Sequence, residues 1–189
     1  MTTRDQILAK VKQNQPQLVP LPDLSLLGKE SFDSVTKFAE TAIAIGSEVI
    51  EIRDFSEIHK YINSKYSGKT LRSTLADFNI ENWLDLSPKE LDGTDFLLVE
   101  ARLGVAENGS IWISDLELGQ RVAPFITEYL GVILDKSKIV NTMHQAYQLI
   151  GNEDYGFGLF LAGPSKTADI EQSLVLGAHG ARGLVIFLK

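Results

Sequence analysis

The chain has 189 residues, of which 44% are hydrophobic and 23% charged, with 18 basic side chains against 25 acidic ones and no cysteine. This composition is ordinary for one globular domain and excludes a disordered, collagenous or coiled-coil protein. The net charge of −7 disfavours nonspecific binding to nucleic acid or anionic membranes, because positive charge drives both. Without cysteine the chain offers no thiolate to zinc or to an iron–sulfur cluster, and three scattered histidines disfavour a metal site.

The N-terminal region is predicted to be a short amphipathic helix over 3–13, followed by an irregular stretch over 14–29 that is rich in proline. Two interpretations of this stretch stay open: an arm that reaches a partner, and a loop packed on the domain. The predicted division is therefore a helix and arm over 1–30 and a single α/β domain over 31–189.

The sequence has neither the apolar core of a signal peptide near its start nor a run of about 18 apolar residues that would span a membrane. We therefore expect a cytoplasmic protein without membrane insertion.

The rest of the chain alternates between helical spacing and short apolar or β-branched runs. The predicted elements are helix 31–45, strand 48–52, helix 55–65, strand 70–75, strand 95–99, strand 129–134, helix 137–150, strand 157–162, helix 168–178 and strand 184–188. Asn108-Gly109 is typical of a hairpin, so residues 104–114 are expected to be antiparallel. The order favours a layered α/β sheet that ends in a β-turn-α-β unit.

The first segment that could carry chemistry is GPSKTADIE, residues 163–171. It would join a strand to a helix at the sheet edge where open α/β sheets bind ligands. Gly163 permits a tight turn, and the hydroxyls of Ser165 and Thr167 would cap the helix. Lys166, together with free backbone N–H groups, would hold an anion.

Two carboxylates in the same segment oppose that reading. Asp169 and Glu171 would stabilise the helix dipole but repel a bound anion. A ligand or partner surface and a merely well-capped helix both stay open. The segment lacks the G-x-x-x-x-G-K-[ST] spacing of a P-loop, so nucleotide hydrolysis is not indicated.

The second segment is GAHGARG, residues 177–183, in which three glycines frame a histidine and an arginine. His179 could transfer a proton or donate a hydrogen bond. Alternatively, the segment only ends the preceding helix, with the Arg182 cation near its negative terminus. If 163–171 and 177–182 form one site, they should share a cleft at one edge of the sheet.

The third segment is AENGS, residues 106–110, on the predicted hairpin. Glu107 on a tight loop could be a nucleophile or a general base. The alternative is an exposed turn carboxylate without a catalytic role.

Three segments together resemble the LUD (lactate utilisation) domain family, in particular its lactate-utilisation protein C type. They are GVAENGSIWIS (104–114), GPSKTADIEQSLVLGAHGARG (163–183) and LVIFL (184–188). The resemblance covers about residues 95–189, with weaker motifs over 31–94. The chain departs from the family pattern A-x-T-G-T at Asn108 and Ser110, and Ala181 stands where the family usually has proline; Ser110 keeps a hydroxyl.

The resemblance implies a three-layer α/β/α fold with a mostly parallel sheet, similar to the sugar-phosphate isomerase and CoA-transferase group. It also implies a bacterial role beside iron–sulfur subunits that oxidise L-lactate to pyruvate, with no cofactor on this chain. In that group small anionic or CoA-linked ligands bind at strand ends. The predicted catalytic residues are Glu107 and His179, and the predicted ligand-binding residues are Ser110, Gly163, Ser165, Lys166, Thr167, Asp169, Glu171 and Arg182.

Three functional hypotheses follow. The first is an accessory subunit of a multi-protein lactate-oxidation system, which the lack of cysteine favours because the electron acceptor must then lie on a partner. The second is a free-standing enzyme acting on a phosphorylated or CoA-linked metabolite through Glu107 and His179. The third is a ligand-binding module in which Lys166 and Arg182 hold a small carboxylate such as lactate. Whether the chain has its own catalysis stays open.

Overall fold

The computed structural model describes residues 2–20, 22–23, 32–78, 82–151, 153–168 and 174–189. Its helices are α1 Thr3–Gln13, α2 Ser34–Ala44, α3 Phe55–Lys65, α4 Pro88–Leu91, α5 Asp115–Leu118, α6 Ala123–Ile126 and α7 Met143–Ile150, with short 3-10 helices η1 Ala76–Phe78 and η2 Lys136–Lys138. Its strands are β1 Glu48–Glu51, β2 Leu71–Ser73, β3 Phe96–Glu100, β4 Leu103–Val105, β5 Ser110–Ser114, β6 Tyr129–Leu134, β7 Ile139–Val140, β8 Gly158–Leu161, β9 Lys166–Ala168, β10 Leu174–Leu176 and β11 Gly183–Leu188.

Five strands form the central sheet in the order β1-β11-β6-β3-β2, and every neighbouring pair is parallel. Val132 of β6, for example, is in register with Ile186 on one side and Val99 on the other. Because all five strands run the same way, their first residues lie at one edge of the sheet, which we call the amino edge, and their last residues lie at the carboxyl edge.

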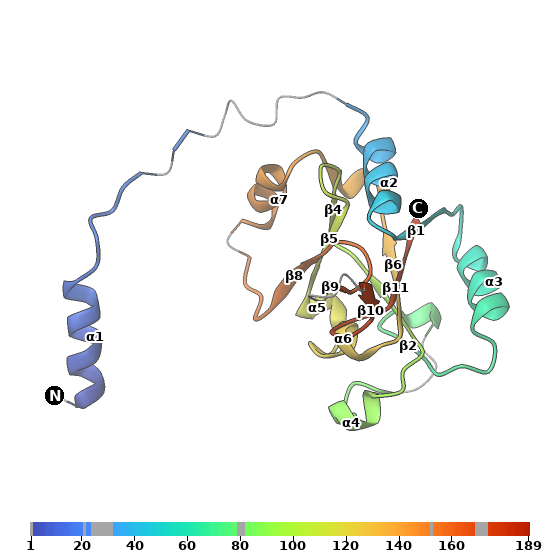
Figure 1. The fold of residues 1–189 in the computed structure, drawn as a ribbon, viewed down its shortest axis with the longest axis horizontal. Coiled ribbons are helices and arrows are strands. Elements are labelled where there is room, and N and C mark those ends of the chain that lie inside the picture. Colours follow the sequence, from blue (N-terminus) through green and yellow to red (C-terminus); the bar gives the residue numbers. More distant parts are fainter. Residues whose placement is uncertain (1, 21, 24–31, 79–81, 152, 169–173) are drawn as a thin grey trace.

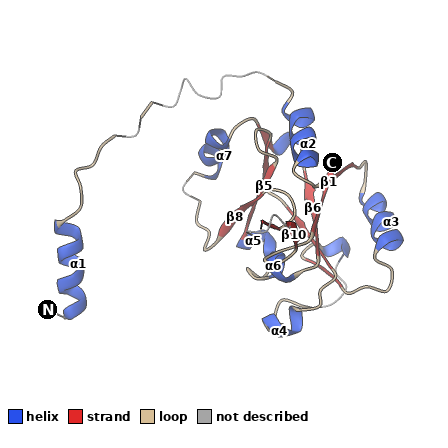
Figure 2. Ribbon diagram, viewed as in Figure 1, coloured by secondary structure: helices blue, strands red, loops and turns tan. Residues whose placement is uncertain are grey.

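Alternating side chains of the central strands face two different cores, as the period of two requires. On one face, Val185 and Phe187 of β11 pack with Ile58 of α3. On the other face, Leu184 and Ile186 belong to a larger core that includes α2 and the second sheet. Figure 2 shows the resulting layers, with α3 on one side of the central strands and β5, β8 and α7 on the other. The expected three-layer α/β fold with a mostly parallel sheet is confirmed.

A second, four-stranded sheet has the order β7-β4-β5-β8. Strands β4 and β5 form the antiparallel hairpin that Asn108-Gly109 predicted. Strand β8 pairs antiparallel with β5, so it belongs to this sheet and not to the central one. The connection from β8 to β11 is therefore no parallel crossover, contrary to the expected β-turn-α-β unit.

The helix predicted over 137–150 begins only at Met143, where Thr142 and Gln145 form a capping box. Ile139 and Val140 instead pair with β4 in the second sheet. Their β-branched side chains fit either state, and pairing with an available strand edge decided between them.

The helix predicted over 168–178 is wrong. Lys166–Ala168 and Leu174–Leu176 are the antiparallel strands β9 and β10. Thr167 and Val175, which pair across this hairpin, are β-branched residues that favour strands, and the large core beside β11 is built with α2 and the second sheet instead. Asp169 and Glu171, predicted to lie in the first turn of that helix, lie outside the described residues.

Helix α1 has the predicted position but buries none of its residues, and it stands clear of the other elements (Figure 1). Residues 15–20 after it are exposed and have no regular structure. Within the described chain, none of the helices has the length and apolar content that crossing a membrane requires.

Candidate functional site

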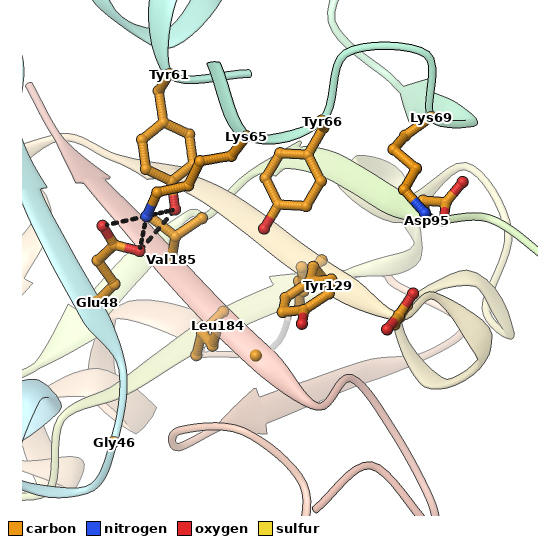
Figure 3. A pocket seen from close by; sticks show the side chains of 13 residues that line it. Gly46, Glu48, Tyr61, Lys65, Tyr66, Lys69, Asp95, Tyr129, Leu184 and Val185 are labelled. Carbon is orange, nitrogen blue, oxygen red and sulfur yellow. Dashed lines mark hydrogen bonds and ion pairs between the residues drawn. The ribbon is translucent and has the colours of Figure 1, made fainter. Parts of the chain in front are cut away.

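A cleft of about 570 Å³ opens at the amino edge of the central sheet. We call it the amino-edge cleft. The end of α3 forms one wall, and the first residues of β1, β6 and β11 form the floor (Figure 3). Its lining residues are Gly46, Glu48, Tyr61, Lys65, Tyr66, Lys69, Asp95, Glu128, Tyr129, Leu130, Gly183, Leu184 and Val185.

One end of the cleft holds a closed cluster of polar groups. The Tyr61 hydroxyl donates to a Glu48 carboxylate oxygen at 2.6 Å, and the Lys65 ammonium donates to both oxygens of that carboxylate at 3.0 Å. The same ammonium lies 3.2 Å from the Tyr61 hydroxyl oxygen and 4.4 Å from the centre of the Tyr61 ring. Tyr61 and Lys65 are one helical turn apart, so α3 presents both to the first residue of β1.

Two tyrosines of the cleft, Tyr61 and Tyr66, stay protonated at neutral pH. Burial, together with the hydrogen bond to Glu48, raises the pKa of Tyr61 well above its usual range. Burial also raises the pKa of Tyr66, and the neighbouring Tyr61 and Tyr129 add to that effect. These phenols can therefore donate hydrogen bonds to a bound molecule, but they cannot act as bases near neutral pH.

The opposite end of the cleft holds a second ion pair. Lys69 lies 3.2 Å from a carboxylate oxygen of Asp95, whose other oxygen accepts the Thr70 amide at 2.8 Å. The Thr70 amide, with a smaller contribution from Lys69, lowers the pKa of Asp95, so this group is ionised at neutral pH. Just beyond, Glu128 pairs with Arg182 at 3.0 Å.

The floor between the two ends is aromatic. The Tyr66 ring packs against Phe96 and Tyr129, with centroid distances of 4.5 and 5.5 Å. Tyr129 lies flat beside Gly183, where a Cβ atom would come within 2.5 Å of its ring. Glycine at this position therefore lets the ring occupy the floor.

This arrangement is suited to binding more than to acid–base catalysis. Its lysines are each paired with a carboxylate, and burial raises the pKa of the Tyr61 and Tyr66 phenols. The two phenols can donate hydrogen bonds to a bound molecule, whereas a general base near pH 7 would need a lower pKa.

The two C-terminal segments singled out in the sequence do meet. The Ser165 amide donates to the Ala181 carbonyl at 2.8 Å, and the Gly177 amide donates to the Ser165 carbonyl at 3.0 Å. The hairpin β9–β10 brings them together, because it folds the chain back on itself where a helix would have held its ends about 15 Å apart. They lie before β11, hence at the amino edge, and not at the carboxyl edge where 163–171 was expected.

The cations predicted to hold an anion are engaged in the protein itself. The Lys166 ammonium donates to the Ile45 carbonyl at the negative end of α2. Arg182 pairs with Glu128 through its side chain and through its amide. His179 is exposed, and Thr167 pairs with Val175 in the hairpin. An incoming anion would have to displace these contacts.

Glu107 and Ser110 lie in the turn between β4 and β5. A Glu107 carboxylate oxygen accepts the Met143 amide at 2.7 Å, at the start of α7. Ser110 is buried, and its hydroxyl donates to the Asn108 side chain at 2.7 Å. Both therefore have structural partners, and their predicted catalytic and ligand-binding roles stay predictions.

The β4–β5 turn and the 163–168 segment contact the same helix end. A Cβ at Gly109 would lie 2.8 Å from the Ala42 nitrogen, and one at Gly163 would lie 2.8 Å from the Ile45 carbonyl oxygen. Gly163 also has a φ of +76°, which favours glycine. The last turn of α2 is thus the common support of two segments that are distant in sequence.

The LUD domain family model matches residues 35–188. The chain belongs to the LUD domain family. The match begins in α2 and ends in β11, so it contains every residue that lines the amino-edge cleft and leaves α1 outside.

Among curated proteins, this LUD chain is similar to an uncharacterized protein of Neisseria meningitidis serogroup B, with 32% identity over 63% of this chain and 55% of that protein. It is also similar to proteins named lactate utilization protein C, with 33% identity to that of Bacillus subtilis over 42% of this chain and 36% of the relative. The protein of the same name from Shouchella clausii is 27% identical over 75% of this chain and 64% of its own length. The alignments thus span between about a third and two thirds of these relatives.

Among solved structures, the fold is similar to that of a DUF162-family protein from Deinococcus radiodurans, with a TM-score of 0.63. The match covers 82% of this chain and 96% of that one at 15% identity. At this identity the likeness supports the LUD fold alone.

Sequence reasoning missed the residues of the cleft. The stretch YINSKYSGK contains two tyrosine–lysine pairs, Tyr61 with Lys65 and Tyr66 with Lys69, at the four- and three-residue spacing of neighbours on a helix. This repeated spacing is the signal for the cleft that the sequence offered. Asp95 and Tyr129 reach the same place from other strands, and only the folded sheet shows it.

Proposed function

We propose that this LUD domain protein is an accessory component of a bacterial system that oxidises L-lactate to pyruvate with iron–sulfur partner proteins. The observation that carries the proposal is the family match over 35–188, together with the name lactate utilization protein C borne by several relatives. The two electrons removed from lactate would pass to clusters on the partners, since this chain contains no cysteine to hold a cluster.

The amino-edge cleft supports a binding role within that system. Its Tyr61 and Tyr66 phenols stay protonated, and its Glu48–Lys65 ion pair is formed without a ligand. A cleft of about 570 Å³ is much larger than lactate, which favours a larger metabolite or a segment of a partner as its occupant.

Co-purification tests the assembly. The tagged chain is co-expressed with the cluster-bearing proteins encoded by neighbouring genes, purified without oxygen, and assayed for bound iron. We expect these proteins to elute together, and we expect the isolated chain to leave lactate unoxidised with dye acceptors. Lactate turnover by the isolated, cluster-free chain would contradict an accessory role.

A matched pair of variants tests the cleft. Tyr66→Leu removes a phenol from the cleft wall, whereas Tyr147→Leu removes an exposed tyrosine of α7 outside the cleft. We expect the first to weaken co-purification about tenfold, the usual effect of losing a central aromatic contact of about 1.4 kcal/mol, and the second to leave it unchanged. Thermal melting of both variants separates lost binding from lost folding.

A further inference from the structure

In the described part of the chain, the basic amphipathic helix α1 buries none of its residues, and an acidic groove lined in part by apolar side chains lies on the domain. We propose that α1 of one copy docks into this groove on a second copy, giving a reciprocal dimer. This inference is independent of the proposed metabolic role.

The helix has the pattern of a docking segment. Ile7, Leu8 and Val11 are 58%, 53% and 58% exposed and lie on one side of α1 at helical spacing. Lys10 follows Ile7 by three residues and Lys12 follows Leu8 by four, which places one lysine on each flank of the apolar stripe. Thr2 and Asp5 form a capping box at the start of the helix, which stabilises its first turn.

The groove lies next to the amino-edge cleft, between the start of β3, α6 and the end of β10, and has a volume of about 390 Å³. Phe125, Ile126 and Leu176 provide apolar surface. Its charged lining residues are Asp92, Asp95, Glu128 and Arg182. Three carboxylates against one arginine give this lining a net negative charge, although Glu128 is paired with Arg182 and Asp95 with Lys69 of the neighbouring cleft.

The two surfaces match in shape and in charge. The apolar stripe of α1 would contact Phe125, Ile126 and Leu176, and its flanking lysines would face the carboxylates of the groove, as in helix-in-groove recognition. The twenty residues between α1 and α2 can span up to about 66 Å, which is ample for reaching a neighbouring copy. Two copies exchanging helices would form a closed twofold contact.

The dimer should be weak, because two short helices bury less than about 1,200 Å², the lower end of the range for standard stable interfaces. We expect sedimentation of the purified full chain to show a monomer–dimer equilibrium with a dissociation constant of tens of micromolar. Raising NaCl from about 50 to about 500 mM should weaken it several-fold, because the charges are exposed.

Adjacent residues of β10 supply a matched control. Leu176 lines the groove and is 48% exposed, whereas Val175 is 47% exposed and points to the other face of the hairpin. Leu176→Glu and Leu8→Glu should each leave only monomer at 200 μM, whereas Val175→Glu and Gln6→Glu should leave the equilibrium unchanged. Circular dichroism checks that the domain stays folded.

Cross-linking decides between exchange and self-docking, and the absence of native cysteines makes it unambiguous. Chains carrying Val11→Cys are mixed with chains carrying Phe125→Cys and oxidised. A disulfide between the two chains supports the proposal. A monomeric wild-type chain, a dimer indifferent to Leu8→Glu and Leu176→Glu, or an internal disulfide formed only when both cysteines share one chain would each overturn it.

Discussion

The two edges of the central sheet carry similar charged residues in different settings. At the carboxyl edge, Glu51 pairs with Lys136 at 3.0 Å and Glu100 with Lys189 at 3.0 Å. At the amino edge, Glu48 also pairs with a lysine at 3.0 Å, but its carboxylate accepts a tyrosine hydroxyl as well.

The difference lies in what surrounds the charges. Open parallel sheets usually bind ligands at the carboxyl edge. Here the aromatic cleft and the segment most specific to the family both lie at the amino edge. At the amino edge the Tyr61 hydroxyl adds a hydrogen bond to the Glu48–Lys65 ion pair, and the rings of Tyr61, Tyr66 and Tyr129 pack in a row beside it. The amino edge is therefore the more constrained of the two.

The largest expected effect concerns the floor of the cleft. Gly183→Ala would place a Cβ 2.5 Å from the Tyr129 ring, so the ring must move. We expect a loss of about 1–3 kcal/mol in the free energy of unfolding, as overpacking usually causes. Gly180→Ala, whose Cβ would lie 3.3 Å from that of Ser165, is the control and should cost below about 1 kcal/mol. Urea denaturation measures the free energy of unfolding of both variants. Equal losses would contradict the expectation that the contact between Gly183 and the Tyr129 ring is especially tight.

A smaller effect should distinguish the two edges on one strand. Glu48 and Glu51 both lie on β1 and both pair with a lysine at 3.0 Å, with side-chain exposures of 45% and 72%. We expect Glu48→Gln to cost about 1 kcal/mol, because the hydrogen-bonded cluster with Tyr61 is lost. Glu51→Gln should cost below about 0.5 kcal/mol, as exposed ion pairs do. If the two costs were equal, the amino edge would be no more constrained than the carboxyl edge.

The smallest expected effect is on how the free energy of unfolding depends on pH. The folded chain holds the pKa of Tyr61 above the ordinary value of 10.0, so above pH 10 the folded state retains a proton that the unfolded state loses. This contribution is complete below pH 10 and declines as the pH rises further. Tyr61→Phe should make the alkaline loss of stability shallower, and Tyr147→Phe should not. Denaturation midpoints measured between pH 9 and 11.5 provide the test, and an unchanged slope in Tyr61→Phe would contradict the assigned environment.

Local sequence determined much of the fold. Helix 55–65 and strand 129–134 have the predicted bounds, because each combines a clear period with strong end signals. Asn108-Gly109 likewise determined the β4–β5 hairpin, since few dipeptides adopt that turn so readily. In these places the local preference and the tertiary packing agree.

Only the tertiary structure decided the region from 163 to 182. Its sequence suits a helix, but the described parts, Lys166–Ala168 and Leu174–Leu176, pair as the antiparallel strands β9 and β10. The cleft is also a tertiary product: Glu48 and Tyr129 begin β1 and β6, Asp95 directly precedes β3 and Tyr66 directly follows α3, and the parallel sheet brings them to one edge. A sequence specifies the conformational preference of each stretch of a few residues. The surface against which that stretch packs depends on all the other elements of the fold, so only the tertiary structure decides it.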